Sequence, residues 1–109
     1  MASIFKNRII KDVGRLPIDV FTVAQNRKVI VLGISMSNIK DSTVLGNVFI
    51  KDETSVTANY VKDVPIPPNG TLRAMNGGEK LILDEAHTLQ VSSSYPDSVD
   101  AIISYVEQT

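Results

Sequence analysis

The sequence contains no cysteine and no tryptophan, and it has a single histidine, His87. The missing cysteines exclude a disulfide scaffold, thiolate metal ligands and a cysteine nucleophile. One imidazole also excludes a histidine-rich metal centre and leaves only one candidate for histidine-based catalysis. Composition therefore removes several common catalytic and metal-binding chemistries before any sequence pattern is considered.

Long apolar runs are absent as well. The longest apolar-rich stretch, Val29 to Met36, has eight residues, whereas a membrane-spanning helix needs about 20. The N-terminal residues MASIFKNRIIKDVG contain basic residues but no apolar run of the length found in secretory signals. We therefore expect neither a membrane segment nor a secretory signal. The 109 residues and the 43% apolar fraction suit one folded domain with its own core.

Apolar and polar residues alternate with period two along most of the chain, and turn residues interrupt the alternation every eight to twelve positions or so. This pattern predicts an all-β fold, a single β-sandwich or jelly roll of about eight short antiparallel strands with an N-terminal arm. We divide the chain into residues 1–15, an N-terminal arm or edge strand, and residues 16–109, the β-sandwich domain. The expected strands cover residues 4–13 (the arm), 18–24, 29–36, 43–51, 55–61, 72–75, 80–83, 88–92 and 99–106, with a turn at residues 76–78.

The strongest expected strand is Val29 to Met36, and alternation places Ile30, Leu32, Ile34 and Met36 on one face of it. We expect the substitution Leu32→Asp to prevent folding, because it would bury an unpaired charge. The full set of expected core residues is Ile30, Leu32, Ile34, Val48, Ile50, Leu81, Leu83, Leu89, Val91, Ile103 and Tyr105.

The formal charge of −1 conceals an uneven distribution along the chain. Residues 1–40 carry seven basic and two acidic residues, and residues 41–109 carry four basic and ten acidic residues. One interpretation is a basic N-terminal arm, with Lys6, Arg8, Lys11 and Arg15, that docks on an acidic neighbour such as the next copy of the protein. The alternative is that both charge sets mix on one folded surface. The basic residues are dispersed among few aromatics, so we expect no nucleic-acid binding.

Three prolines, Pro65, Pro67 and Pro68, fall within four residues of one another. Such a segment cannot form a central strand, because proline has no backbone N–H to donate. The prolines either protect a sheet edge from unwanted pairing or stiffen a segment that contacts a partner protein.

Catalytic or metal-binding patterns are weak throughout. His87 lies in the expected turn 84–87, where we expect a surface residue rather than a base or ligand, and it belongs to no HxH or HExxH motif. The neighbouring acids Asp52-Glu53, Asp84-Glu85 and Asp97 with Asp100 are expected to be solvated turn residues, and no calcium-loop motif is present. The segment from Ser92 to Tyr95 is either a plain loop or a sugar-binding loop. We expect no enzyme activity, no cofactor and no metal site.

The second half of the chain has a distinctive order of turn and core residues. It comprises Pro65-Ile66-Pro67-Pro68, Leu72, Gly77-Gly78, Lys80 to Leu83, Thr88-Leu89, Val91, and Val99-Asp100 through Ser104 to Glu107. These positions resemble a group of small all-β virion proteins of tailed bacteriophages, and Val29 to Asn38 resembles a strand of the same group. The resemblance covers about residues 18–109 and departs at Ala86-His87, where a Gly-Asp turn is more usual.

The resemblance implies a non-enzymatic structural protein of a tailed-phage virion, present in many copies as a capsid decoration or cement protein or in the neck collar. The implied partners are major capsid or connector proteins and copies of itself, in a homo-oligomer assembled in the bacterial host cytoplasm and located in the virion. The candidate interaction residues are Lys6, Arg8, Lys11, Arg15, Pro65, Pro67 and Pro68. The alternatives are a carbohydrate- or receptor-binding β-sandwich module of the phage tail and a hydrolase with dispersed carboxylates.

Overall fold

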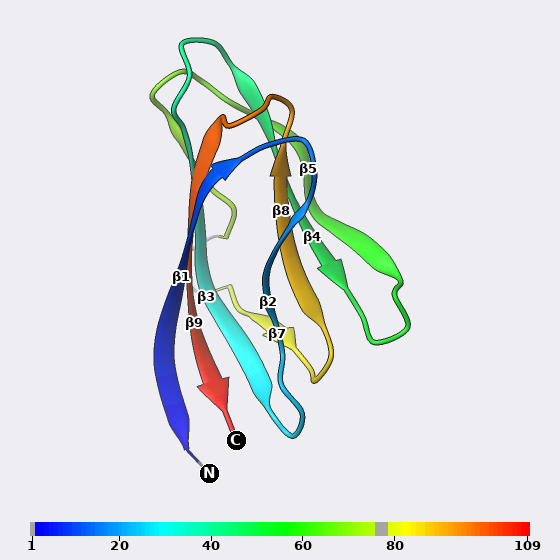
Figure 1. The fold of residues 1–109 in the computed structure, drawn as a ribbon. Helices are drawn as coiled ribbons and strands as arrows, with labels where there is room; N and C mark the ends of the chain where they lie inside the picture. The colour runs from blue at the N-terminus through cyan, green and yellow to red at the C-terminus, as the bar shows by residue number, and fades with distance from the viewer. Residues whose placement is uncertain (1, 76–78) are drawn as a thin grey trace.

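A computed structural model describes residues 2–75 and 79–109 and shows two antiparallel β-sheets packed as a sandwich (Figure 1). The predicted all-β sandwich is thereby confirmed. The strands in the described ranges are β1 (Ser3–Val13), β2 (Ile18–Thr22), β3 (Lys28–Asn38), β4 (Val44–Lys51), β5 (Thr57–Ile66), β6 (Thr71–Arg73), β7 (Leu81–Leu83), β8 (Thr88–Ser93) and β9 (Val99–Gln108). Within these ranges no helix is long and apolar enough to cross a membrane. The turn expected at residues 76–78 lies outside the described residues.

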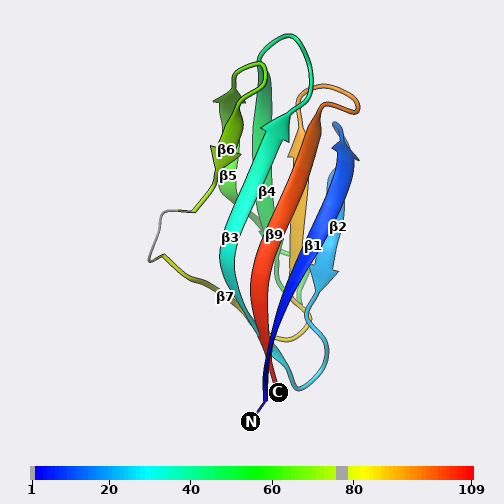
Figure 2. The same cartoon turned by 90° about the vertical axis from the view of Figure 1, so that its left-hand side faces the viewer.

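Each of the nine strands in the described residues belongs to one of two sheets. The five-stranded sheet has the order β1-β9-β3-β6, with β7 also paired to β3, and the four-stranded sheet has the order β2-β8-β4-β5. The antiparallel pairs join β1 to β9, β2 to β8, β3 to β6 and β7, and β4 to β5. The chain is therefore one long hairpin rolled so that successive arms enter opposite sheets, which is the topology of a jelly roll. Figure 2 shows the five-stranded sheet from its outer side, with β1, β9 and β3 next to one another.

The core lies between the inner faces of the two sheets. Seven of the eleven expected core residues are buried there, and two more pack against them while partly exposed. The buried seven are Ile34, Val48, Leu83, Leu89, Val91, Ile103 and Tyr105, and the partly buried two are Ile50 and Leu81. Sequence alternation therefore identifies most of the core, and its failures are confined to one strand.

Strand β3 contains a β-bulge at Leu32. Val31 lies opposite Tyr105 of β9, and the next paired residue of β3 is Gly33, opposite Ser104, so Leu32 is an additional residue without a partner on β9. An additional residue shifts the alternation by one position, so the side chains beyond it change faces.

The prediction that Ile30 and Leu32 belong to the core is therefore wrong. Val29 and Val31 point inward before the bulge, and Ile34 points inward after it. Ile30 lies on the outer face and is partly exposed, and Leu32 is 41% exposed. The expectation that Leu32→Asp prevents folding depended on the unbulged strand and is replaced by the opposite expectation below.

Candidate protein-interaction surface

The basic residues near the N-terminus lie on an edge strand. β1 pairs with β9 along its length, from Ser3 opposite Gln108 to Val13 opposite Val99, so residues 3–13 do not extend away from the domain. The register places Lys6 and Arg8 in the row whose side chains point toward the four-stranded sheet.

Both inward-pointing cations bind groups of the same chain. The Nζ of Lys6 lies 2.9 Å from Oε1 of Glu107, and the Nε of Arg8 donates a hydrogen bond of 3.0 Å to the carbonyl oxygen of Val20 on β2. The hydrogen bond from Lys6, with Arg27 nearby, holds the pKa of Glu107 below its usual value. Inward-pointing charges on an edge strand discourage pairing with a further strand. Lys6 and Arg8 thus have a structural role in this domain.

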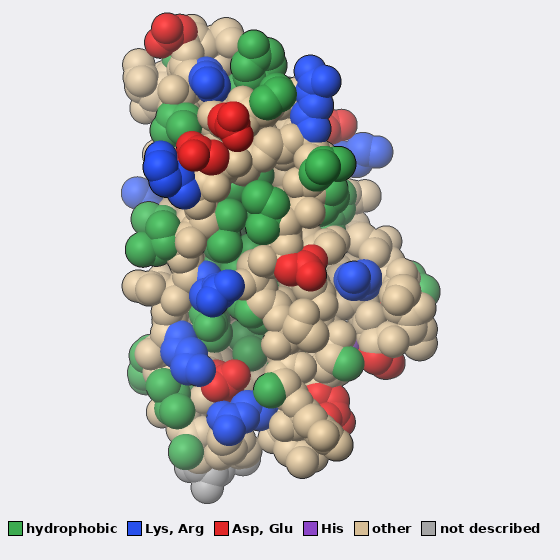
Figure 3. Space-filling model, viewed as in Figure 1, with side chains coloured by type: hydrophobic (Ala, Val, Ile, Leu, Met, Phe, Trp, Pro, Cys, Tyr) green, Lys and Arg blue, Asp and Glu red, His purple; other side chains and the backbone are tan. Residues whose placement is uncertain are grey.

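The other two basic candidates lie toward the turn that follows β1. The Nζ of Lys11 is 3.5 Å from Oδ1 of Asp12, and the Nε of Arg15 donates to the carbonyl oxygen of Ser94 at 3.3 Å. In Figure 3, Lys and Arg side chains are interspersed with Asp and Glu side chains over the visible face. The view thus favours mixing of the two charge sets over a separate basic arm.

The proline cluster lies at the edge of the four-stranded sheet. Pro65 is in the edge strand β5, opposite Leu45, whereas Pro67 and Pro68 follow the strand, and all three prolines are exposed. The amide of Gly70 donates to the carbonyl oxygen of Pro67 at 2.9 Å and closes the turn. A proline on an edge strand offers no N–H to an incoming strand, so Pro65 fits the edge-protecting interpretation.

Folding brings two of the three acidic pairs to one end of the sandwich. A shallow recess there is lined by Glu53, Asp84, Glu85, Ala86 and His87. His87 lies in the expected turn, and its Nε2 is 2.8 Å from Oε2 of Glu53. In residues 2–75 and 79–109, no group of three or more His, Asp or Glu side chains is arranged to hold a metal ion.

Two of the three serines of the possible sugar-binding loop are buried, and the third, Ser94, is exposed and accepts a hydrogen bond of 2.9 Å from the amide of Leu45. Ser92 and Ser93 are buried. The hydroxyl of Ser93 lies 2.6 Å from that of Ser98 and 3.1 Å from the carbonyl oxygen of Val13. These hydroxyls hold the β8–β9 turn to the end of β1, so the polar groups proposed for a sugar are engaged within the chain.

Sequence reasoning missed the most distinctive surface, the outer face of the five-stranded sheet. Five large hydrophobic side chains on this face are exposed, and together we call them the outer apolar face. They are Phe5 (77% exposed), Ile9 (69%), Ile82 (58%), Ile102 (46%) and Leu32 (41%). The strand register places four of them in two cross-strand rows. In one row Ile9 lies opposite Ile102. In the other row Phe5 lies opposite Val106, Val106 lies opposite Ile30, and Ile30 lies opposite Ile82.

Val106 shows that this face forms an apolar cluster of its own. It points away from the inner row of β9 and is not part of the core cluster between the sheets, yet it is only 8% exposed. Its cross-strand neighbours Phe5 and Ile30 flank it on the two sides. The outer apolar face therefore consists of two apolar rows with Asn7 and Ser104 between them, and Leu32 lines a recess beside each row.

The outer face of the four-stranded sheet is different. In the described residues, none of the exposed large hydrophobic side chains comes from β2, β4, β5 or β8. Its polar side chains bind one another, with 2.9 Å between the hydroxyls of Thr22 and Thr88 and a 2.7 Å hydrogen bond from Gln90 to Asp19. Only one side of the sandwich therefore has the character of a protein-interaction surface.

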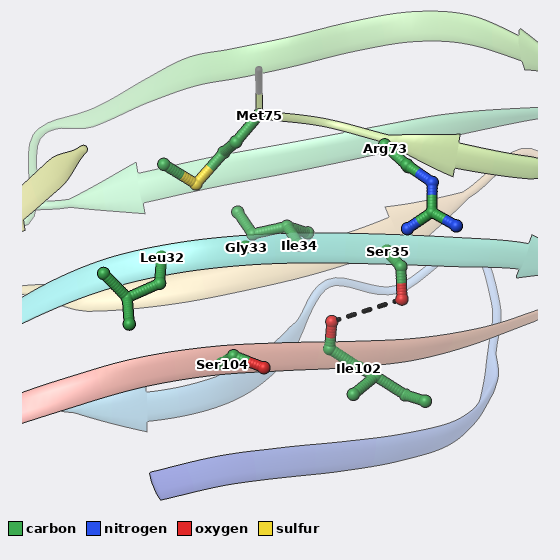
Figure 4. A pocket seen from close by; sticks show the side chains of 8 residues that line it. All are labelled: Leu32, Gly33, Ile34, Ser35, Arg73, Met75, Ile102 and Ser104. Atoms are coloured by element: carbon green, nitrogen blue, oxygen red, sulfur yellow. Dashed lines mark hydrogen bonds between the residues drawn. The ribbon is translucent and has the colours of Figure 1, made fainter. Parts of the chain in front are cut away.

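Two adjoining recesses, which share Leu32 and Ser104 as lining residues, lie on the outer apolar side. The first has a volume of about 270 Å³ and lies between β3, β9 and the segment from Arg73 to Met75 (Figure 4). Its floor includes Gly33, where an added Cβ would meet no atom within 4 Å. The second recess is bordered by Phe5 and Asn7 of β1.

A weak sequence signal for this surface does exist. The edge strand β1 contains two apolar doublets, Ile4-Phe5 and Ile9-Ile10, which put apolar side chains on both of its faces. A strand at the edge of a sheet with one solvated face has no need of a second apolar row, so the doublets set this strand apart from such edge strands.

Comparison with known proteins identifies the fold only. No protein-family model matches the sequence, and no curated protein matches it. A solved structure from Bacillus endospore appendages, described as disulfide-linked pili, superposes with a TM-score of 0.57 at 6% identity over 98% of this chain and 88% of that chain. A chain of the T13 IBDV viral particle superposes with a TM-score of 0.60 at 7% identity over 96% of this chain. This chain spans only 30% of that viral chain.

Proposed function

We propose that this protein is a non-enzymatic structural protein that assembles with other protein subunits. The observation that carries the proposal is the contrast between the outer faces of the two sheets: five large hydrophobic side chains are exposed on one, whereas in the described residues none of the exposed large hydrophobics comes from the strands of the other. Monomeric proteins seldom leave such a patch uncovered, and patches of this kind usually mark binding surfaces.

The similar folds support an assembly role. They occur in a pilus and in a viral particle, which are both built from protein subunits. The pili in the comparison are disulfide-linked, and this chain has no cysteine. Its assembly therefore uses no disulfide links, and burial of an apolar face is the main driving force for non-covalent contacts.

The more specific form of the proposal places the protein in the virion of a tailed bacteriophage, as a capsid decoration or cement protein or in the neck collar. It is supported by the resemblance of residues 18–109 to small virion proteins. Its partners are then major capsid or connector proteins and copies of itself. The lack of cysteine agrees with assembly in the reducing cytoplasm of a bacterial host.

The direct test is to purify phage particles on a density gradient from a culture that expresses the gene and to count this protein per particle by quantitative mass spectrometry. A large multiple set by the symmetry of the shell supports a decoration or cement role, and a single small ring supports the neck. Absence from washed particles overturns the virion proposal.

A matched pair of variants tests which surface makes the attachment. Ile9→Lys puts a charge on the outer apolar face, and Asn59→Lys puts the same charge on the exposed edge strand β5. We expect the first variant to leave the particle and the second to stay. Equal retention of both would mean that the outer apolar face is not the attachment surface.

A further inference from the structure

We propose that the outer apolar face binds the same face of a second copy in a two-fold symmetric dimer, in which Phe5 of each subunit enters the recess above Gly33 of the other. The inference rests on the assembly role proposed above, and it names the partner and the contact. It rests on three features: the protruding phenyl ring of Phe5, a recess large enough for that ring, and polar side chains in the middle of the face that can hydrogen-bond to the same side chains of a second copy.

The protruding element is Phe5. Its side chain is 77% exposed at the end of the cross-strand row that continues through Val106 and Ile30. The receiving element is the recess of about 270 Å³ over Gly33. A cavity of about 150 Å³ is enough to hold a benzene ring, so the recess has room for a phenyl ring.

The chemistry of the recess also suits an aromatic ring. Leu32, Met75 and Ile102 supply apolar walls, and Arg73 borders the opening (Figure 4). A guanidinium group stacks favourably on an aromatic face. The bare backbone at Gly33 lets the ring approach the sheet closely.

The positions of ring and recess fit a two-fold axis. Phe5 on β1 lies opposite Val106, and Gly33 on β3 lies opposite Ser104, so the two elements flank β9 on its two sides. An axis that lies in the interface and passes over β9 near these residues exchanges β1 of one subunit with β3 of the other. Both rings then meet both recesses, and the contact is closed and self-complementary.

The polar groups in the middle of the face favour a second copy as the occupant. Asn7 lies opposite Ser104, and Ser35 lies in the neighbouring row of β3. Amide and hydroxyl groups both donate and accept hydrogen bonds, so each of them can bind a copy of itself. Lys11 and Lys28 of the outer rows lie toward the two ends of the strands, where like charges need not meet, and Arg73 lies at the recess, where it faces the entering ring.

The available area is that of an ordinary dimer. The five side chains of the outer apolar face expose roughly 600 Å² of apolar surface, taking about 200 Å² for each fully exposed large side chain. A standard interface buries about 800 Å² per partner, of which a little over half is apolar. The face therefore supplies the apolar area that a stable dimer needs.

The test uses two variants that alter opposite halves of the contact. Phe5→Ala removes the ring, and Gly33→Leu fills the recess from a position where an added Cβ meets no atom within 4 Å. Asn59→Leu, on exposed β5, is the matched control for adding a leucine to the surface. Sedimentation velocity over a concentration series measures the dimer dissociation constant, and circular dichroism verifies that each variant is folded.

We expect the natural sequence and the control to sediment as dimers. Each of the two variants should raise the dissociation constant at least tenfold, as substitutions at central contacts do. An equal mixture of Phe5→Ala and Gly33→Leu subunits should form heterodimers, because the intact ring of one enters the intact recess of the other. This complementation is specific to the exchanged ring-and-recess arrangement.

Three results would overturn the proposal: a monomeric natural protein at about 100 μM, a Gly33→Leu variant that dimerises as tightly as the natural sequence, or a mixture that shows no heterodimer. A monomer that still co-purifies with particles would reject the dimer and leave the structural role intact. A dimer that is absent from particles would reject the virion role and leave the dimer contact intact.

Discussion

The bulge in β3 makes neighbouring residues differ sharply in their tolerance of a charge. Val31 is fully buried, whereas Leu32 is 41% exposed. We expect Val31→Asp to prevent stable folding, because a buried, unpaired carboxylate costs several kcal/mol and a domain of this size is stable by only about 5–15 kcal/mol.

Leu32→Asp should have a small effect. A fully buried leucine contributes about 1.5–3 kcal/mol, so the partly exposed Leu32 contributes about 1 kcal/mol, and its replacement carboxylate can reach water. For a domain of this length, 1 kcal/mol corresponds to a fall in Tm of about 4–8 °C. Differential scanning calorimetry at pH 7 measures both variants, at a protein concentration low enough that dimer formation does not contribute to the Tm.

A milder pair keeps the comparison measurable if Val31→Asp yields no folded protein. Val31→Ala should destabilise the domain by about 2 kcal/mol, through lost burial and the cavity left behind, and Leu32→Ala by less than half of that. The reasoning is refuted if Leu32→Asp abolishes the cooperative transition while Val31→Asp retains it, since that result would require an unbulged strand.

Three further predictions concern other contacts. Asn38→Ala should lower the free energy of unfolding in urea by about 1–3 kcal/mol. The buried side-chain amide of Asn38 donates hydrogen bonds of 2.8 and 2.9 Å to the backbone carbonyl oxygens of Ser42 and Ile66. A change below about 0.5 kcal/mol would contradict this prediction. Glu107→Gln should reduce the loss of folding stability at acid pH by about 0.2–1 kcal/mol. Lys6 lowers the pKa of Glu107 from 4.5, so the stabilisation by this pair is complete above that pH and is lost as the pH falls through the lowered folded-state pKa. Calorimetry that shows the same loss of stability at acid pH in the variant and the natural protein would argue against the ion pair. Gly46→Ala should destabilise by about 1–3 kcal/mol, because the new Cβ would lie 2.9 Å from Cδ1 of Ile66; a thermal melt like that of the natural sequence would refute this.

Strand positions were predictable wherever turn residues mark both ends. The expected strand 43–51 corresponds to β4 (Val44–Lys51), and the expected strand 88–92 corresponds to β8 (Thr88–Ser93). Both strands alternate without interruption between an inner apolar row and an outer row. Period-two reasoning succeeds in them because the additional residues of their irregular pairings lie in the neighbouring strands β5 and β2 and not in β4 or β8.

The face of β3 was not predictable from alternation. Apolar residues occupy both rows from Val29 to Leu32, so the pattern by itself gives either row as the inner one. The signal for the bulge was Gly33, since an isolated glycine within a strand often marks a bulge or a close backbone approach. In this protein it marks both a bulge next to it and the floor of an open recess.

The proline segment shows how position in the sheet overrides local propensity. The sequence ended its strand at Val61, but β5 continues to Ile66. Pro65 is tolerated because β5 is an edge strand, where the missing N–H faces no partner strand. The prolines themselves indicate a sheet edge, but the pairing of Val64 to Ile66 with β4 depends on the whole strand order, which the sequence of this segment does not contain.

The interaction surface escaped sequence reasoning because it is made by pairing between distant segments. Ile9 and Ile102 are adjacent only because β1 pairs with β9. Counting charges along the chain had the same weakness, since Lys6 meets its acidic partner Glu107 from the opposite end of the sequence. Local composition identified the basic residues but could not show that two of them are bound within the fold.

The division of roles within β1 restricts how copies can meet. Its inner row places Lys6 and Arg8 beside the sheet edge, and the edge strand β5 carries Pro65, so one edge of each sheet is protected against strand addition. Its outer row places Phe5 and Ile9 on an apolar face. The proposed association is therefore face-to-face packing, which closes after a defined number of subunits, and not edge-to-edge pairing, which has no natural end.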